Sequence, residues 1–291
     1  MEVDARSRNT SGQRVALIGA SGFIGSATLT ALRTRDNVDV IGVQLAESDE
    51  SDVASCDITD LESLRAVLRG VDVVIHAASY IGYDEVECER VNVQGTSNVV
   101  AACAGAGVRR LIYVSTAAVY GAGVHRDARE SDLIVAPNSV LSATRARAEE
   151  LVLEAGGIVI RPHFVFGTGD RWLVPGIRKL LNGIKGIPDA GRARHSTIEV
   201  LELGDLLAQL AVAPGVSGPT VFHASATDPA TLAQIAHSSL SAEDFNALED
   251  LSRDEAYKRA QNAGLSARHI DWLADDHVYN SSAIWEALRL R

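Results

Sequence analysis

The stretch V-A-L-I-G-A-S-G-F-I-G, residues 15–25, decides the fold. Its first four residues are apolar and predict a strand buried on both faces, and the run then breaks at three glycines. Gly19 permits a tight bend out of the strand, Gly22 lets the backbone approach a pyrophosphate, and Gly25 lets the next helix pack on the sheet. That helix, expected at residues 27–33, would point free N–H groups at an anion. The strand, glycine turn and helix together predict dinucleotide binding.

Length and charge narrow the kinds of partner. The chain has 291 residues, 46% of them hydrophobic, which is enough for one large domain or for a large domain with a smaller one. Its formal net charge of −11 disfavours nucleic acid and anionic membrane, because an acidic surface repels both. We therefore expect a small-molecule partner, with no nucleic acid and no membrane.

The N-terminal segment and the cysteines indicate the cytoplasm. The first dozen residues are polar and lack the apolar core of a signal peptide, and residues 1–13 are expected to be flexible. No later run reaches the ~20 apolar residues of a membrane helix. Cys56, Cys88 and Cys103 are far apart and odd in number, which predicts reduced core thiols rather than disulfides or a zinc site. No metal site is predicted.

Strand patterns alternate with helix patterns after the glycine turn. This alternation, over about five repeats, predicts an α/β fold with a doubly wound, parallel Rossmann sheet whose strand ends meet at one edge. The expected strands lie at residues 38–43, 68–78, 109–115 and 157–162, and the expected helices at 61–67, 89–106 and 141–155.

The amino-acid composition and the length of the helical patterns change after Pro162. Glycine and proline become frequent, the helical patterns are short, and Trp272 and Trp285 fall in the C-terminal part. We predict a dinucleotide-binding domain at residues 14–165 and a smaller, mostly helical substrate lobe at 166–291, with the chain able to cross between them. A substrate cleft between the two is the expected consequence.

The residue after the second strand bears on the choice between NAD and NADP. Such sites usually place a carboxylate there for the ribose 2′-hydroxyl, whereas this chain has Gln44. A neutral side chain does not repel a 2′-phosphate, which tilts the prediction toward NADP(H), with NAD(H) as the other choice. This preference for NADP(H) is slight, because the acidic Glu47 and Asp49 are close in sequence to Gln44, whereas Arg33 and Arg35 lie further away, near the end of the preceding helix. Equally, Gln44 can be a loop residue without a role in selectivity.

The triplet C-D-I, residues 56–58, is a candidate adenine site. The Asp57 carboxylate can accept from the exocyclic amine of adenine while Ile58 packs on its ring. An aspartate before a helix is more often an N-cap, however, and Asp57 or Asp60 can be only that.

Several motifs in order resemble one family. The chain is similar to extended short-chain dehydrogenases/reductases, in the branch of the nucleotide-sugar epimerases and dehydratases. The likeness covers nearly the whole chain after the first dozen residues. The motifs are G-A-S-G-F-I-G (19–25), D-I-T-D (57–60), H-A-A-S (76–79), N-V-Q-G-T (92–96), Y-V-S-T-A-A-V-Y-G (113–121), R-P-H-F-V-F-G-T-G-D (161–170) and a helix start near Gly204 and Asp205.

The resemblance implies roles by position. Asn92 would brace the sheet edge, residues 162–164 would bound the nicotinamide pocket, and Thr116 would hydrogen-bond the reacting oxygen, or else only its own backbone. The implied cofactor-binding residues are Gly19, Ser21, Gly22, Phe23, Ile24, Gly25, Gln44, Asp57, Ile58, Ala77, Ala78, Ser79, Asn92, Arg145, Pro162, His163 and Phe164.

The likeness fails at the pair that transfers protons. The family uses Tyr-x-x-x-Lys, one helical turn apart and facing the nicotinamide. Here the window P-N-S-V-L-S-A-T-R-A-R-A-E-E-L, residues 137–151, places Leu141 at the tyrosine and Arg145 at the lysine. No tyrosine lies between Tyr120 and Tyr257, so no shift of register restores it. Leucine can neither give nor take a proton, whereas the always-charged Arg145 can still bond ribose hydroxyls.

The missing pair favours ketone reduction. Oxidation of an unactivated sugar alcohol needs the tyrosine as base, whereas a ketone takes its hydride from the cofactor and its proton from elsewhere. We expect an NAD(P)H-dependent ketoreductase, similar to atypical reductases of antibiotic pathways, acting on an aromatic polyketide of angucyclinone type. A substrate phenol, water or Thr116 would meet the new alkoxide. A non-catalytic dinucleotide sensor explains the missing pair equally simply, and a nucleotide-sugar epimerase or dehydratase is the third reading.

Other residues are candidates for the substrate cleft. A flat substrate would stack on Tyr83 or Trp172, although an aromatic residue in a lid is as often core. His195 lies in R-A-R-H-S, which is typical of substrate contact or of a solvated basic loop, and His163 either faces the nicotinamide or bonds backbone. The predicted substrate set is Tyr83, Ala117, Leu141, Trp172 and His195. The family often forms dimers through two helices, expected here at residues 89–106 and 141–155, which implies a homodimer.

Overall fold

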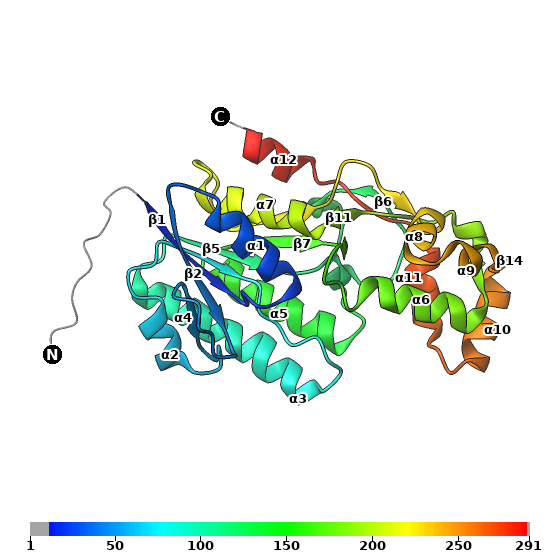
Figure 1. Ribbon diagram of the computed structural model, residues 1–291, viewed down its shortest axis with the longest axis horizontal. Coiled ribbons are helices and arrows are strands. Elements are labelled where there is room, and N and C mark those ends of the chain that lie inside the picture. The colour runs from blue at the N-terminus through cyan, green and yellow to red at the C-terminus, as the bar shows by residue number, and fades with distance from the viewer. Residues whose placement is uncertain (1–11, 290–291) are drawn as a thin grey trace.

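A seven-stranded sheet organises the molecule, as the computed structural model of residues 12–289 shows (Figure 1). Its order is β12-β7-β5-β4-β1-β2-β3, and its strand pairs are parallel, which confirms the predicted α/β Rossmann architecture. The predicted flexible segment lies outside the described residues except for its last two, and Gln13 begins the first strand. The strands are β1 (Gln13–Ile18), β2 (Val38–Gln44), β3 (Val53–Ser55), β4 (Val73–His76), β5 (Arg110–Val114), β7 (Ile158–Pro162) and β12 (Thr220–Ala224).

Two of these strands were absent from the predicted set. β3 is three residues long and pairs with β2 at the sheet edge, too short to give a periodic pattern. β12 lies in the part assigned to the substrate lobe, yet it pairs with β7 along its whole length. After the first part of the segment assigned to the lobe, the chain therefore crosses back and completes the large sheet.

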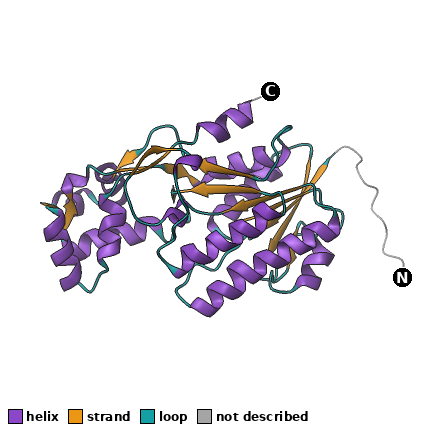
Figure 2. Cartoon of the chain, turned by 180° about the vertical axis from the view of Figure 1, so that it is seen from behind, coloured by secondary structure: helices purple, strands orange, loops and turns teal. Residues whose placement is uncertain are grey.

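Helices cover both faces of the sheet (Figures 1 and 2). α1, α7 and α12 contribute to the core on one face, and α2, α4 and α5 to the core on the other. These helices span α1 (Phe23–Arg33), α2 (Leu61–Val67), α4 (Thr96–Ala106), α5 (Val140–Glu154), α7 (Val200–Val212) and α12 (Ser282–Arg289).

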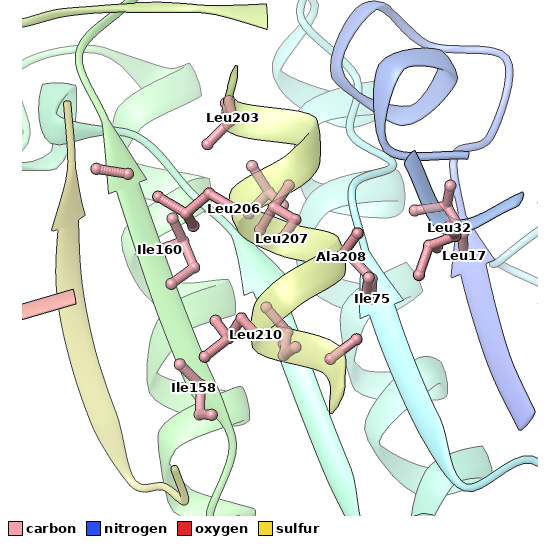
Figure 3. Close-up of a cluster of buried hydrophobic side chains, with 14 of the residues drawn as sticks. Leu17, Leu32, Ile75, Ile158, Ile160, Leu203, Leu206, Leu207, Ala208 and Leu210 are labelled. Atoms are coloured by element: carbon pink, nitrogen blue, oxygen red, sulfur yellow. The ribbon is translucent and has the colours of Figure 1, made fainter. Parts of the chain in front are cut away.

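Leucines of α7 fill the core on the first face (Figure 3). Leu206, Leu207 and Leu210 are fully buried against sheet residues that include Ile75 and Ile160. Burial of apolar area stabilises the fold by about 25 cal/mol per Å², so this packing holds α7 on its face of the sheet.

Three helix predictions need correction. α1 begins at Phe23, directly after the glycine turn, rather than at residue 27. The helix expected at 89–106 is a composite of α3 (Glu85–Glu87), a π-helical segment η1 (Cys88–Gly95) and α4. α7 begins at Val200, so Gly204 lies inside it, where a Cβ would stand 2.7 Å from the carbonyl carbon of Ala27. Gly204 thus permits close packing of α7 on α1 rather than starting a helix.

The second lobe has its own core. Its helices pack around Phe164, Ile177 and Trp272, whereas Trp285 packs on the core of the large sheet, which corrects its assignment to the lobe. A small sheet, β13-β10-β15-β6, and the pair β11-β8 join the lobe to the large domain. The lobe comprises α6 (Leu173–Ile184), α8 (Leu232–Ser239), α9 (Ala242–Asn246), α10 (Arg253–Asn262), α11 (Ala267–Ala274), β9 (Gly186–Pro188), β14 (Glu249–Leu251) and η4 (Asp189–Gly191). The joining strands are β6 (His125–Ala128), β8 (Phe164–Phe166), β10 (Arg194–His195), β11 (Thr197–Glu199), β13 (Ala230–Thr231) and β15 (His277–Tyr279).

Two further observations concern the described residues. Cys56, Cys88 and Cys103 are buried free thiols, and burial raises the pKa of Cys56 to about 11 and of Cys103 to about 12.

Within residues 12–289, none of the helices is both long and apolar enough to cross a membrane.

Candidate functional site

The glycine turn leaves no room for side chains at two of its three positions. Gly19 has φ of +91°, and a Cβ there would stand 2.6 Å from the amide nitrogen of Ala78. A Cβ on Gly25 would stand 1.9 Å from the carbonyl oxygen of Gly19. At Gly22 a Cβ would meet only that same oxygen, at 3.2 Å, so this position is open toward the outside. Gly22 also caps α1 with its bare backbone, which leaves first-turn N–H groups facing an approaching anion.

Near the end of β2, where the adenosine of the cofactor is predicted to lie, both arginines are held in ion pairs. Gln44 ends β2, and its Nε2 donates to the carbonyl of Ala46 at 3.2 Å. Arg33 donates from Nε to Asp52 at 2.8 Å and also pairs with Glu50, whereas Arg35 donates to Asp205 at 2.7 Å. Both arginines considered for a 2′-phosphate are thus engaged by carboxylates.

The two aspartates of D-I-T-D have different local roles. Asp60 is the N-cap of α2, where its carboxylate accepts from the backbone N–H groups of Glu62 and Ser63. Asp57 instead accepts from the backbone N–H of Thr59 at 2.9 Å and from its hydroxyl at 2.8 Å. One oxygen of Asp57 is therefore used by its own turn, and the adenine contact stays a prediction.

Asn92 connects the loop after β4 to α5. Its Oδ1 accepts from the backbone N–H of Tyr80 at 2.8 Å, and its Nδ2 donates to the Tyr80 carbonyl at 3.0 Å and to Thr144 Oγ1 at 3.2 Å. The side chain is buried within the π-helical segment. These bonds fix the position of residues 77–79, which follow β4 at the edge where the cofactor is expected.

The first turn of α5 carries Leu141 and, one turn later, Arg145. Ser139 caps the helix by accepting from the N–H of Ser142 at 3.1 Å, which sets where α5 begins. Leu141 is partly exposed at that end of the helix, whereas Arg145 is buried.

Arg145 bridges the ends of two strands. Its Nη1 donates to Ser79 Oγ at 2.7 Å, and its Nη2 donates to the carbonyl of Val114 at the end of β5. Its guanidinium carbon lies 5.3 Å from the centre of the Tyr113 ring, and its Nε is buried without a partner among the described residues. Protein atoms therefore already engage this side chain, and its contact with a ribose stays a prediction.

Thr116 caps a short 3₁₀-helix, η2 (Ala117–Tyr120). Its Oγ1 accepts from the N–H of Ala118 at 3.1 Å, which is the backbone role weighed for it from the sequence. The hydroxyl proton is still available for a further bond, because a hydroxyl both accepts and donates.

The predicted substrate residues fall into different environments. Tyr83 and Trp172 are 90% and 61% exposed, so neither belongs to a core. Ala117 is buried, and Leu141 is partly exposed. His195 is fully buried in β10, which makes the prediction of a solvated basic loop wrong: β10 pairs with β13 and β15, and this enclosure removes the ring from water.

The end of β7 leads into the second lobe. Pro162 closes the strand, and the His163 ring stacks on that of Phe164 with centroids 4.1 Å apart. The backbone N–H of Phe164 donates to the carbonyl of Ser196 at 3.2 Å, so this turn is tied to the lobe side.

Sequence reasoning missed a buried polar network beneath α5. Arg161 donates from Nε to Glu149 Oε1 at 3.0 Å, and both side chains are almost completely buried. Tyr120 Oη accepts from Arg161 Nη1 at 2.8 Å and lies 2.6 Å from His223 Nε2. The sequence does show charged residues within apolar segments, which is a sign of a buried polar network. It does not show which of these residues pair with one another across four separate elements.

It also missed a group of histidines, His125, His163, His195 and His277, that gather where the lobes meet. Within residues 12–289, no group of three or more His, Cys, Asp or Glu side chains has a geometry that could hold a metal ion.

A family model matches the chain over residues 16–198, more than half its length; its description is the 3-beta hydroxysteroid dehydrogenase/isomerase family. The chain belongs to this family. The membership places it among the extended short-chain dehydrogenases/reductases, as the motifs suggested, and the family is of oxidoreductase type.

Individual family relatives match over part of their length. A 3beta-hydroxysteroid-dehydrogenase/decarboxylase of Arabidopsis thaliana is 39% identical over 42% of this chain and 24% of its own. The 3 beta-hydroxysteroid dehydrogenase/Delta 5-->4-isomerase of vaccinia virus is 30% identical over 54% of this chain and 53% of its own. A 4-hydroxy-2-methyl-3-oxo-4-farnesyl-3,4-dihydroquinoline-1-oxide ketoreductase of Stigmatella aurantiaca is 32% identical over 67% of this chain and 64% of its own. The chain thus spans about a quarter to a half of the first two relatives.

Solved structures share the fold at low identity. MoeE5 in complex with UDP-glucuronic acid and NAD superposes with a TM-score of 0.72 at 22% identity, over 94% of this chain and 92% of that one. DesIV, a dTDP-glucose 4,6-dehydratase from Streptomyces venezuelae with NAD and TYD bound, gives 0.72 at 21% identity, over 96% and 92%. At these identities the likeness supports the fold alone.

Proposed function

We propose that this protein is an NAD(P)H-dependent ketoreductase that works without a tyrosine and lysine acid/base pair. The observation that carries the proposal is the contrast between the close-packed glycine turn and the first turn of α5. By its place in the motif window, residues 137–151, Leu141 falls where the resemblance implies the tyrosine, and the guanidinium of Arg145 is bound by Ser79 and Val114. The chain keeps the means to bind a dinucleotide and lacks a side chain that transfers a proton at position 141.

The residues present fit a nicotinamide dinucleotide. Gly19 and Gly25 let the backbone pack closely at the start of α1, where a Cβ would collide with the backbone of Ala78 or of Gly19, and the backbone N–H groups there suit a pyrophosphate. When bound in reduced form, the dinucleotide supplies a hydride. Neutral Gln44 favours NADPH, but the ion pairs of Arg33 and Arg35 keep this preference small, so we propose that both cofactors serve.

The chain's own residues contribute orientation rather than acid catalysis. Thr116 keeps a hydroxyl proton for the substrate oxygen, and Leu141 presents an apolar surface at the same end of α5. Reduction of a ketone needs one hydride at carbon and one proton at oxygen. We propose that a phenol next to the ketone gives that proton and is reprotonated by water, as an aromatic polyketide of angucyclinone type allows.

Relatives support a ketone as the substrate class. The Stigmatella relative is named a ketoreductase, and a protein of Stenotrophomonas maltophilia that is 29% identical over 70% of this chain is named a 2-alkyl-3-oxoalkanoate reductase. The sequence also resembles the angucyclinone ketoreductase of simocyclinone biosynthesis in its missing pair, and a substrate of that type is part of the proposal. Exposed Tyr83 and Trp172 offer rings for stacking on a flat substrate.

The double substitution Leu141→Tyr with Arg145→Lys tests the proton source. If the substrate supplies the proton, restoring the pair changes kcat for a phenol-bearing ketone by less than about tenfold, because the added phenol duplicates an existing acid. An increase of orders of magnitude would overturn substrate-supplied protonation. Tight NADPH binding without turnover of any ketone, together with a co-purifying protein, would instead support a dinucleotide sensor.

A further inference from the structure

Three histidines form a row across the small sheet that joins the lobes. His195 pairs with His277, and His277 with His125, at matching positions of β10, β15 and β6. Their ring centroids are 5.8 and 5.5 Å apart. The ring of His163 packs over the row, 5.2 Å from His277 and 5.8 Å from His195. We call these four residues the histidine ladder.

The histidine ladder is poorly satisfied for a core. His195 is fully buried and His277 is 3% exposed. His195 Nε2 lies 3.2 Å from the Leu273 carbonyl, but its Nδ1, both ring nitrogens of His277 and Nε2 of His163 are buried without partners in the described part of the chain. Phenylalanine or leucine would fill such a place without unpaired polar atoms. A cost of this kind in a native core calls for a functional account.

Acidic groups near the ladder are already engaged. Asp276 accepts from Arg126 Nε at 2.8 Å and from the backbone N–H of Arg194 at 2.9 Å. Asp275 accepts from Arg253 Nη1 at 2.6 Å. These carboxylates are therefore held by arginines rather than by a ladder ring.

The remaining polar neighbours are phenols and one more histidine. Tyr279 Oη lies 3.0 Å from His125 Nδ1, and its ring stacks on that of Tyr120 at 5.7 Å. His223, 5.1 Å from the Tyr279 ring, has its Nδ1 3.2 Å from the Asn280 carbonyl and 3.7 Å from Glu130. Phe164 and Trp272 close the side toward the lobe core.

These surroundings keep the histidine ladder uncharged near neutral pH. Burial lowers the pKa of His195 and, with repulsion from the neighbouring histidines, that of His277, each to about 4. Burial and the other three rings hold the pKa of His163 well below its ordinary value, and burial lowers the pKa of His125. A protonated histidine in the ladder would be a buried positive charge without a hydrogen-bonded partner, next to other histidines that can also take up protons. Protonation therefore favours separation of the strands.

The ladder is connected to the turn at residues 162–164 by backbone bonds. Ser196 accepts at its carbonyl from the N–H of Phe164, and the N–H of Ser196 donates to the carbonyl of His277 at 2.8 Å. β10 and β15 thus carry two rungs of the ladder and, through Ser196, also anchor the turn. Movement of β10 against β15 would move His163 and the turn with it.

We propose that His195 and His277 are positioning residues that hold the turn at residues 162–164, through His163, only while the histidine ladder is uncharged. The proposal rests on the proposed function in one respect: that this turn bounds the nicotinamide pocket. The consequence is a reductase whose nicotinamide end loosens in acid while its glycine turn still holds the dinucleotide.

Fluorescence of bound NADH tests the proposal without needing turnover. The nicotinamide emission is followed from about pH 8 to about pH 5, the range in which unperturbed histidines titrate, with circular dichroism recorded in parallel. In the paired sheet the rungs stay uncharged down to about pH 4, whereas separated strands expose histidines whose pKa is near the ordinary ~6.5, so acid below about pH 6 favours the separated state. The wild type is therefore expected to lose the bound-nicotinamide signal progressively below about pH 6 while its helix signal persists. In His277→Gln, and separately in His277→Phe, which keeps ring volume, this loss moves down by about one pH unit, because one protonatable rung is gone.

Kinetics and a control separate positioning from packing. At pH 7.5 we expect His277→Gln to lower kcat about tenfold and to leave the dissociation constant of NADH within about threefold. His237→Gln, in an exposed histidine of α8 in the same lobe, is expected to match the wild type in both measurements.

Two results would overturn the proposal. One is a wild-type acid transition in which the nicotinamide and helix signals are lost together, because this indicates global unfolding. This measurement uses the wild type alone, so it does not depend on whether a variant folds. The other is a pair of His277 variants with wild-type kcat and wild-type acid transition. If the wild type reduces no ketone yet shows the separate nicotinamide transition, the proposed function fails and the positioning role stands.

Discussion

The glycine turn and the nicotinamide end of the site differ in how the chain builds them. In the turn, Gly25 meets Gly19 six residues away, and both are fixed by backbone contacts. At the nicotinamide end, Arg145 reaches Ser79 and Val114, and His163 packs on strands from residues 195 and 277. The predicted binding element is thus encoded locally, whereas the proposed chemistry rests on long-range contacts of side chains that protein atoms already engage. The difference teaches that one part of the site can stay intact while the other is rebuilt.

The largest expected effect comes from breaking the local half. In Gly25→Ala a Cβ would stand 1.9 Å from a backbone oxygen that has no rotamer to escape into. We expect NADH affinity to fall about a hundredfold or more and the fold to lose about 1–3 kcal/mol, as overpacking does. Isothermal titration with NADH and thermal unfolding measure the two losses.

Gly105→Ala is the matched control. Gly105 lies in α4, where a Cβ would find nothing within 4 Å. This change should leave NADH affinity unaltered and raise stability by roughly 0.5–1 kcal/mol, since alanine is the better helix former. A Gly25→Ala variant that binds NADH as well as this control would show that the turn is not the binding element.

The next largest effect is expected in the buried polar network beneath α5, on the side of the predicted nicotinamide end. Glu149→Gln leaves the guanidinium of Arg161 buried without its carboxylate, which costs about 3–5 kcal/mol. Chemical denaturation measures this loss. Glu89→Gln removes the partner of Arg147 in an exposed pair and should cost less than about 1 kcal/mol. Equal losses in the two variants would mean that the network under α5 does not support the site.

The smallest effect concerns cofactor choice at the adenosine end. Gln44→Glu places a carboxylate near a 2′-phosphate, a repulsion on the order of 1 kcal/mol in exposed surroundings. The ratio of kcat/KM for NADPH to that for NADH is expected to fall about fivefold, since about 1.4 kcal/mol would be a factor of ten. Gln261→Glu, the same charge change on α10, should leave the ratio unaltered. An unaltered ratio in both would show that Gln44 has no part in selectivity.

The sequence predicted what local patterns encode. The helix expected around residues 61–67 coincides with α2, the strand expected at 38–43 falls one residue short of β2, and Gly19 has the positive φ that a tight bend after β1 requires. Each depends on neighbours within a few residues, so periodicity and glycine spacing suffice.

What the sequence did not reveal depends on distant partners. β12 joins the sheet beside β7 across some sixty residues, the π-helical turn keeps an ordinary helical pattern, and His195 is buried only because β15 arrives from the C-terminal part. A histidine in a basic segment carries no local sign of such burial. The roles of Thr116 and Arg145 in chemistry stay predictions: Thr116 bonds the nearby backbone, as the sequence allowed, and Arg145 bonds Ser79, a partner that the sequence did not reveal.

Transfer of deuterium from reduced dinucleotide labelled at the nicotinamide C4 position tests the central claim most directly. The wild type is given an aromatic ketone with an adjacent phenol and, separately, the methyl ether of the same ketone, and the alcohols are analysed by mass spectrometry. The account predicts one deuterium at the new carbinol carbon of the phenol substrate and a rate at least about a hundredfold lower for the ether, the usual contribution of a positioned acid. Equal rates for the two ketones, or bound dinucleotide with no deuterium in any product, would contradict it.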